Sequence, residues 1–183
     1  LRYFKDEDEG RAIKKTGSAQ GISAVSTQLP DFVGMTKDGT KDLGRLFDEK
    51  VFPFPKPVEL IKYIISIGTI GKENALILDF FAGSGTTGQA VFQYNAENET
   101  SNRRFILCTN NENNICREVT YERIIRAIRQ EKYVESLKYY KIDYVPTFKK
   151  FYYEYAGELL LHIPELIELE NSIDCKSCTY IRF

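Results

Sequence analysis

The fold is decided by the stretch Ala75-Leu-Ile-Leu-Asp-Phe-Phe-Ala-Gly-Ser-Gly-Thr-Thr-Gly88. Its first seven residues form an apolar run with one acid, which is typical of a strand buried on both faces of a parallel sheet. Gly83 and Gly85 then break the strand, and Thr86 and Thr87 offer hydroxyls that can cap a following helix. The sequence therefore predicts a strand, a glycine turn and a helix N-terminus, where a ligand can approach bare backbone and free N–H groups can hold an anion.

Two kinds of cofactor compete for such a turn. Gly83, Gly85 and Gly88 satisfy the dinucleotide pattern G-x-G-x-x-G, which has little specificity by itself. Asp79 argues against a dinucleotide, because a carboxylate here would repel the pyrophosphate that lies on this turn. S-adenosylmethionine has no phosphate and carries a sulfonium and an ammonium that Asp79 can attract. A phosphate-binding P-loop is excluded because no lysine follows the last glycine. Asp79 therefore favours S-adenosylmethionine over NAD.

Several stretches around this turn carry a family resemblance. Asp79–Thr87 resembles motif I of DNA amino-methyltransferases, and Phe54–Ile61 resembles motif X of their β class. Arg104–Ile124 and Lys138–Pro146 are similar to the modification subunits of type III restriction-modification systems. The resemblance covers roughly residues 30 to 146, in the order that those subunits use. It implies an α/β, Rossmann-like S-adenosylmethionine-dependent methyltransferase fold and methyl transfer to adenine N6 in DNA.

The resemblance also implies which residues contact the cofactor. Motif X lines the methionine end of the cofactor in the β class, although a proline-rich run such as 52–57 also suits a rigid connector. Ribose recognition stays open, because Thr109 stands where the family's acid would be, and Asn110, Asn111 and Glu112 can either bind the ribose or cap the next helix. The expected cofactor contacts are Asp79, Phe80, Gly83, Ser84, Gly85, Thr86, Phe54, Lys56, Pro57, Asn110 and Glu112.

The catalytic half of the site is not predicted within these residues. The family orients the target amine with an Asp-Pro-Pro-Tyr type motif, and no two consecutive prolines occur in the 183 residues. We expect the chain to be the C-terminal, cofactor-binding portion of a longer subunit, inactive alone and prone to self-association through uncovered apolar sheet surface. The expected partners are double-stranded DNA, the N-terminal part of the same subunit, a restriction subunit and a second modification subunit. The alternatives are a non-catalytic assembly module and an NAD-dependent oxidoreductase.

Composition narrows the class of protein further. The chain is 43% hydrophobic and 28% charged, as is ordinary for a soluble globular domain, and its net charge of −1 lacks the basic surplus of a free-standing nucleic-acid binder. No apolar run is long enough to span a membrane and no signal peptide opens the chain, so we expect a cytoplasmic protein. The four cysteines are expected to be reduced, and Cys175-x-x-Cys178 and the single histidine, His162, are given no metal role.

Three segments are predicted along the chain. Residues 1–40 would be the tail of a target-recognition region and a linker, residues 41–146 the S-adenosylmethionine-binding core, and residues 147–183 a helical and aromatic extension. Within the core, helical spacing begins near Thr40 and again at Val58–Ile67, and a second buried strand is expected at Phe105–Thr109. A strand is also expected at Tyr140–Tyr144. A long helix is expected at 114–132, with its arginines largely off the buried stripe, namely Arg117, Arg123, Arg126 and Arg129.

Overall fold

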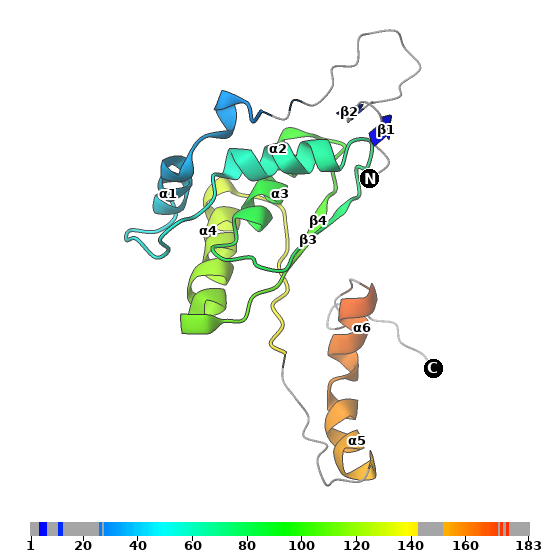
Figure 1. Cartoon of the computed structure of the whole chain (residues 1–183). Helices are drawn as coiled ribbons and strands as arrows, with labels where there is room; N and C mark the ends of the chain where they lie inside the picture. The colour runs from blue at the N-terminus through cyan, green and yellow to red at the C-terminus, as the bar shows by residue number, and fades with distance from the viewer. Residues whose placement is uncertain are drawn as a thin grey trace. The chain divides into compact units, whose positions relative to one another are not determined.

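The computed structural model describes residues 4–6, 11–12, 26, 28–142, 152–171, 173 and 175. The chain divides into two compact units, Leu1–Lys138 and Tyr139–Phe183. The helices and strands of the first unit are coloured from blue to yellow in Figure 1. In chain order they are β1 (Phe4–Asp6), β2 (Arg11–Ala12), η1 (Asp31–Val33), α1 (Thr36–Gly44), α2 (Val58–Gly68), β3 (Leu76–Asp79), α3 (Thr86–Glu97), β4 (Arg104–Leu107), η2 (Glu112–Asn114), η3 (Cys116–Tyr121) and α4 (Glu122–Glu131).

The site is built on a parallel pair of strands. β3 and β4 run in register from Leu76 opposite Arg104 to Asp79 opposite Leu107, and β1 and β2 form a separate antiparallel pair. Helices α2, α3 and α4 lie on one side of β3 and β4 (Figure 1). α3 connects the two strands as the crossover that a parallel pair requires.

The prediction that β3 and β4 are buried on both faces is wrong. Ile77 and Phe105 pack against the core beneath α2 and α3. The alternate residues Leu76, Leu78 and Ile106 point to the other face and are 55%, 49% and 41% exposed. The helices of this unit cover only one side of the strand pair, so a continuous apolar run is here half exposed.

Helices α2 and α3 form the main core. Val58 and Ile65 on α2 pack against Ala90 and Val91 on α3, and all four are buried. Lys62 on α2 reinforces this contact, because its Nζ lies 2.9 Å from a Glu59 carboxylate oxygen and 2.6 Å from one of Glu97 on α3. Burial alone would lower the pKa of Lys62, but the hydrogen bonds to Glu97 and Glu59 outweigh it and raise the pKa above its usual 10.5.

Helix α1 is attached to this core through its polar face and its end. It begins at Thr36, earlier than the spacing predicts, and the carboxylate of Asp38 caps it by accepting from the backbone N–H of Met35 at 2.8 Å. Asp42 on α1 caps α2 by accepting from Val58 N–H at 3.0 Å. Just beyond the end of α1, buried Leu46 and Phe47 pack with Leu43 of α1 and with Ala127 of α4.

The second unit contains two helices in its described residues. It contains α5 (Tyr152–Leu161) and α6 (Ile163–Asn171). The predicted strand at 140–144 does not form over its described residues, since Tyr140 and Ile142 are in irregular backbone and Ile142 is 85% exposed; Tyr144 lies outside the described residues. A strand needs a neighbour for its backbone hydrogen bonds, and within the described ranges no paired strand accompanies these residues. Over the same ranges, no helix is both long and apolar enough for a membrane span.

Candidate cofactor-binding site

The turn after β3 is held by the carboxylate of Asp79. One Asp79 oxygen accepts from the backbone N–H of Phe81 at 3.0 Å, and the other accepts from the Thr87 hydroxyl at 2.6 Å. Gly83 and Gly85 have φ values of +52° and +76°, which glycine adopts without strain. A helix follows the turn as predicted, but α3 already begins at Thr86 with Gly85 as its N-cap, and the hydroxyls of Thr86 and Thr87 bind Lys56 and Asp79 instead of capping it. The acid, the glycine bend and the helix N-terminus therefore lie together.

The stretch that resembles motif X lies against this turn. The hydroxyl of Thr86 donates to the backbone carbonyl of Lys56 at 3.3 Å, and a Cβ added to Gly83 would lie 3.5 Å from the ring of Phe52. The ring of Phe54 is 71% exposed, and the side chain of Lys56 is also exposed. Pro55 and Pro57, on either side of Lys56, are buried and hold the segment in place. The segment 52–57 and the glycine turn, which are far apart in sequence, thus lie together at the carboxyl end of β3.

Exposed polar side chains also follow the carboxyl end of β4, which lies beside the carboxyl end of β3. Asn110 accepts from the backbone N–H of Glu112 at 3.3 Å, and both side chains are exposed. Asn111 instead caps the next helical segment, because its side-chain oxygen accepts from the N–H groups of Cys116 at 3.0 Å and Arg117 at 3.3 Å. Asn111 is thus engaged in capping, while Asn110 and Glu112 face solvent.

The position of Arg123 differs from the predicted one. The sequence predicts an arginine off the buried stripe, but the side chain of Arg123 is completely buried. Its Nε donates to Gln89 Oε1 at 2.8 Å, and its Nη1 donates to Ser84 Oγ at 3.0 Å and to Thr86 Oγ1 at 2.7 Å. Burial lowers the pKa of the guanidinium to about 10, with Asp42 opposing the shift, so the group stays charged at neutral pH. The interior side of the glycine turn therefore carries a positive charge.

A π-helical turn precedes Arg123. Residues 116–121 form η3, in which each turn holds more residues than in an α-helix. The buried positions of η3 and α4 are Val119, Thr120, Arg123, Ile124 and Ala127, so Arg123 lies on the buried stripe, four residues from both Val119 and Ala127. The same turn brings the Thr120 hydroxyl to the Gly83 carbonyl, to which it donates at 2.6 Å. Arg123 and Thr120 both hold the turn from the side of α4.

Gly85 in the turn and Gly88 in α3 allow η3 and α4 to approach closely. A Cβ on Gly85 would lie 3.1 Å from the Thr120 carbonyl oxygen, and a Cβ on Gly88 would lie 2.5 Å from the end of the Ile124 side chain. Gly88 therefore serves the packing of α3 on α4. It is the third glycine of the dinucleotide pattern, and packing alone accounts for it.

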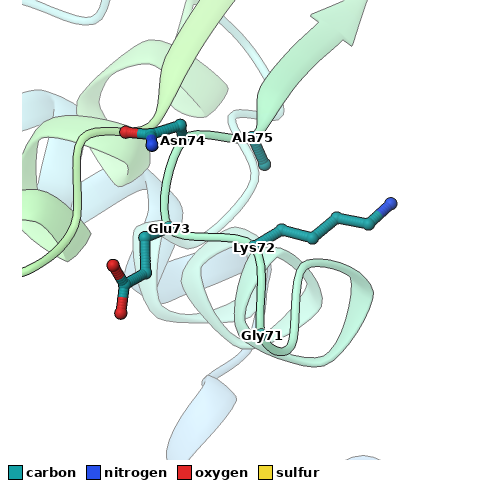
Figure 2. Close-up of a pocket in the computed structure, with 5 residues that line it drawn as sticks. All are labelled: Gly71, Lys72, Glu73, Asn74 and Ala75. Atoms are coloured by element: carbon teal, nitrogen blue, oxygen red, sulfur yellow. The ribbon is translucent and has the colours of Figure 1, made fainter.

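A separate surface hollow lies at the opposite end of β3. It is lined by Gly71, Lys72, Glu73, Asn74 and Ala75, in the turn between α2 and the strand (Figure 2). The side chains of Lys72 and Glu73 point away from each other, so they do not converge on a ligand. None of the predicted site residues lines this hollow. In the part of the chain that the structure describes, no group of three His, Cys, Asp or Glu side chains could hold a metal ion.

Comparison with known proteins gives this site a family. The sequence model of the DNA methylase family matches residues 5–122. The chain belongs to the DNA methylase family. This match spans the strand pair, the glycine turn and η3. The family indicates a methyltransferase fold of the S-adenosylmethionine-dependent kind, to which the helix-rich first unit with its small parallel sheet contributes.

Individual DNA methylases are similar to the chain over part of its length. The Mod subunit of the type III restriction-modification enzyme StyLTI of Salmonella typhimurium is 38% identical over 109 residues, which are 60% of this chain and 16% of that protein. The EcoPI Mod subunit of Escherichia phage P1 is 48% identical over 71 residues, which are 39% of this chain and 10% of that protein. The type II methyltransferase M.KpnI of Klebsiella pneumoniae is 35% identical over 98 residues, which are 54% of this chain and 23% of that protein. The resemblance to type III modification subunits is thus confirmed.

Proposed function

We propose that this chain supplies the S-adenosylmethionine-binding part of a Rossmann-like DNA methyltransferase. One observation carries the proposal: the segment 52–57 lies against the glycine turn through the hydrogen bond from Thr86 to Lys56, with Asp79 at that turn. The exposed side chains of both stretches then gather where β3 and β4 end. Ligands of open α/β sheets bind at the carboxyl ends of the strands.

The residues at this edge fit S-adenosylmethionine in charge and in exposed surface. Each oxygen of Asp79 accepts one hydrogen bond and keeps a further lone pair for a cationic group. Phe80 is 65% exposed beside it and offers apolar surface, and the exposed carboxylate of Glu112 can accept from ribose hydroxyls. The bound cofactor supplies an activated methyl group; the chain's part is to hold it and set its orientation.

The predicted contacts within the turn would act through backbone rather than side chain. Half-buried Gly83 leaves the turn open to close approach, whereas Gly85 is buried against Thr120. The hydroxyls of Ser84 and Thr86 are buried and already hydrogen-bonded. We therefore assign Ser84 and Thr86 to the cofactor through their main-chain groups. Phe54 and Lys56 would contact it with their exposed side chains, while buried Pro57 holds that segment in place.

The substrate and partners are inferred from the relatives. Three similar proteins are named Mod subunits of type III restriction-modification enzymes, and we propose that the intact protein methylates adenine N6 in DNA alongside a restriction subunit. The target base would be turned out of the duplex to reach the methyl group. An Asp-Pro-Pro-Tyr type motif would come from outside these 183 residues, within which no two prolines are consecutive. Residues 41–146 are proposed as the cofactor-binding core.

Parallel calorimetric titrations of the chain with S-adenosylmethionine and with NAD test the proposal. We expect saturable binding of S-adenosylmethionine and none of NAD. Glu112→Gln should weaken S-adenosylmethionine by about tenfold, because one hydrogen bond to a charged group contributes about 1.5 kcal/mol. Glu73→Gln, in the hollow before β3, is the matched control and should bind as the wild type does. Preference of the wild type for NAD contradicts the proposal.

A further inference from the structure

We propose that Arg123 is a positioning residue that fixes the glycine turn in the shape required for cofactor binding. The inference rests on the proposed function, since it assigns a role in that same site. Arg123 lies on α4, 37 residues beyond Thr86. It joins the turn to this helix by hydrogen bonds to the hydroxyls of Ser84 and Thr86. Because its side chain is completely buried, it acts on a ligand through the turn and not by contact.

The guanidinium determines which way the turn's hydroxyl hydrogens point. Arginine can only donate, so Ser84 Oγ and Thr86 Oγ1 accept from Nη1. The Lys56 carbonyl can only accept, so Thr86 uses its one hydrogen there, at 3.3 Å. Ser84 must then donate to Thr86 across 3.2 Å. The result is one directed chain of hydrogen bonds from Arg123 through the turn to the segment 52–57.

The surroundings of Arg123 are unusual for a residue that only stabilises the fold. Its hydrogen-bond acceptors are neutral oxygens of Gln89, Ser84 and Thr86, and among the described residues no carboxylate forms an ion pair with it. Its Nη2 is buried without a hydrogen-bond partner in the described part of the chain. Burying a charge in this way is costly, and well-packed apolar residues often replace buried charges at no loss of stability. A role in the shape of the turn would account for a charge buried at this cost.

Lysine cannot take over this role. The planar fork of arginine reaches Gln89 with Nε and the two hydroxyls with Nη1, whereas the three donors of a lysine ammonium lie on one nitrogen, which cannot occupy both positions at once. Arg123→Lys therefore keeps the charge and loses the geometry. Arg126→Lys is the matched control, because Arg126 lies on the same helix and donates to the Leu46 carbonyl at 3.0 Å, away from the turn.

Hydrogen exchange measured by mass spectrometry reads the turn directly, without cofactor. In Arg123→Lys, amides of residues 82–88 should exchange about 10- to 100-fold faster than in the wild type, which is the effect of losing one hydrogen bond to a charged group. S-adenosylmethionine affinity should fall by a factor of the same order. Arg126→Lys should leave both the exchange of residues 82–88 and the affinity unchanged.

Two results overturn the inference. One is a folded Arg123→Lys whose turn exchanges at the wild-type rate. The other is faster exchange spread equally over the whole unit, which marks a purely structural residue. If Arg123→Lys does not fold, Ser84→Ala removes one acceptor from the other end of the contact while Arg123 itself is retained, and the same two readouts decide. If the wild type does not bind S-adenosylmethionine, the proposed function fails, and the exchange rates of the turn alone decide whether Arg123 holds it.

Discussion

Gly39 on α1 gives the sharpest mutational test of how the segment 52–57 is held. A Cβ at this position would overlap the Pro55 carbonyl oxygen and lie 2.6 Å and 2.8 Å from the carbonyl carbon and oxygen of Lys56. These are backbone atoms between two buried prolines, so they must move by about 1 Å to reach an ordinary van der Waals separation. Overpacking of this kind costs about 1–3 kcal/mol, against about 1 kcal/mol gained from replacing glycine in a helix.

Gly44 on the same helix provides the control for Gly39→Ala. A Cβ there would meet nothing within 4 Å, so Gly44→Ala carries the same chemical change without the overlap and should stabilise the chain by about 0.5–1 kcal/mol. Urea unfolding followed by circular dichroism should place Gly39→Ala about 1–3 kcal/mol below Gly44→Ala. Its affinity for S-adenosylmethionine should also fall, because Lys56 is displaced from Thr86. Equal stabilities of the two variants refute the reasoning.

Three further predictions address the turn, the core and the open sheet face. Thr87→Val keeps the shape of the side chain and removes the donor to Asp79, so calorimetric unfolding should show a loss of about 1–3 kcal/mol, and an unchanged transition contradicts that hydrogen bond. The raised pKa of Lys62 means that its contribution is complete below pH 10.5 and is lost as the pH rises beyond it; unfolding across this range should show a steeper fall for the wild type than for Lys62→Met, and parallel curves argue against it. Leu78→Lys, on the exposed face, should reduce self-association in sedimentation velocity with little change in stability, whereas a wild type that is already monomeric contradicts the expected association.

The local parts of the fold could be predicted from the sequence. The apolar run and the glycines specify the strand, the bend and the presence of a helix after it, because each depends on neighbouring residues only. The predicted capping role of Thr86 and Thr87 is wrong, since both lie inside α3. α2 begins at Val58 as predicted, directly after the last proline of 52–57. The position of Asp79 at the bend is specified by the same stretch.

Which face of the strands is exposed could not be predicted from their composition. An apolar run indicates that both faces suit a core, but which face is covered depends on where the helices pack. Here they cover Ile77 and leave Leu76 and Leu78 exposed. That arrangement is a property of the tertiary structure.

The burial of Arg123 could not be predicted from the apolar residues alone. A stripe drawn through the large apolar residues of this segment leaves out Thr120 and Arg123, which are buried with Val119, Ile124 and Ala127. An arginine spaced four residues from both Val119 and Ala127 was the available signal, since both of those positions are buried. An arginine at helical spacing from buried apolar residues is therefore a candidate for a buried hydrogen-bond donor.

The proposed function depends above all on the carboxylate of Asp79, which makes the glycine turn a site for a cationic cofactor. Calorimetric titration of Asp79→Asn with S-adenosylmethionine, beside the wild type, tests this dependence, with circular dichroism to establish that the variant is folded. We predict that affinity falls by about tenfold or more, because a charge-assisted contact is lost. A folded Asp79→Asn that binds S-adenosylmethionine as tightly as the wild type would show that the carboxylate does not select the cofactor.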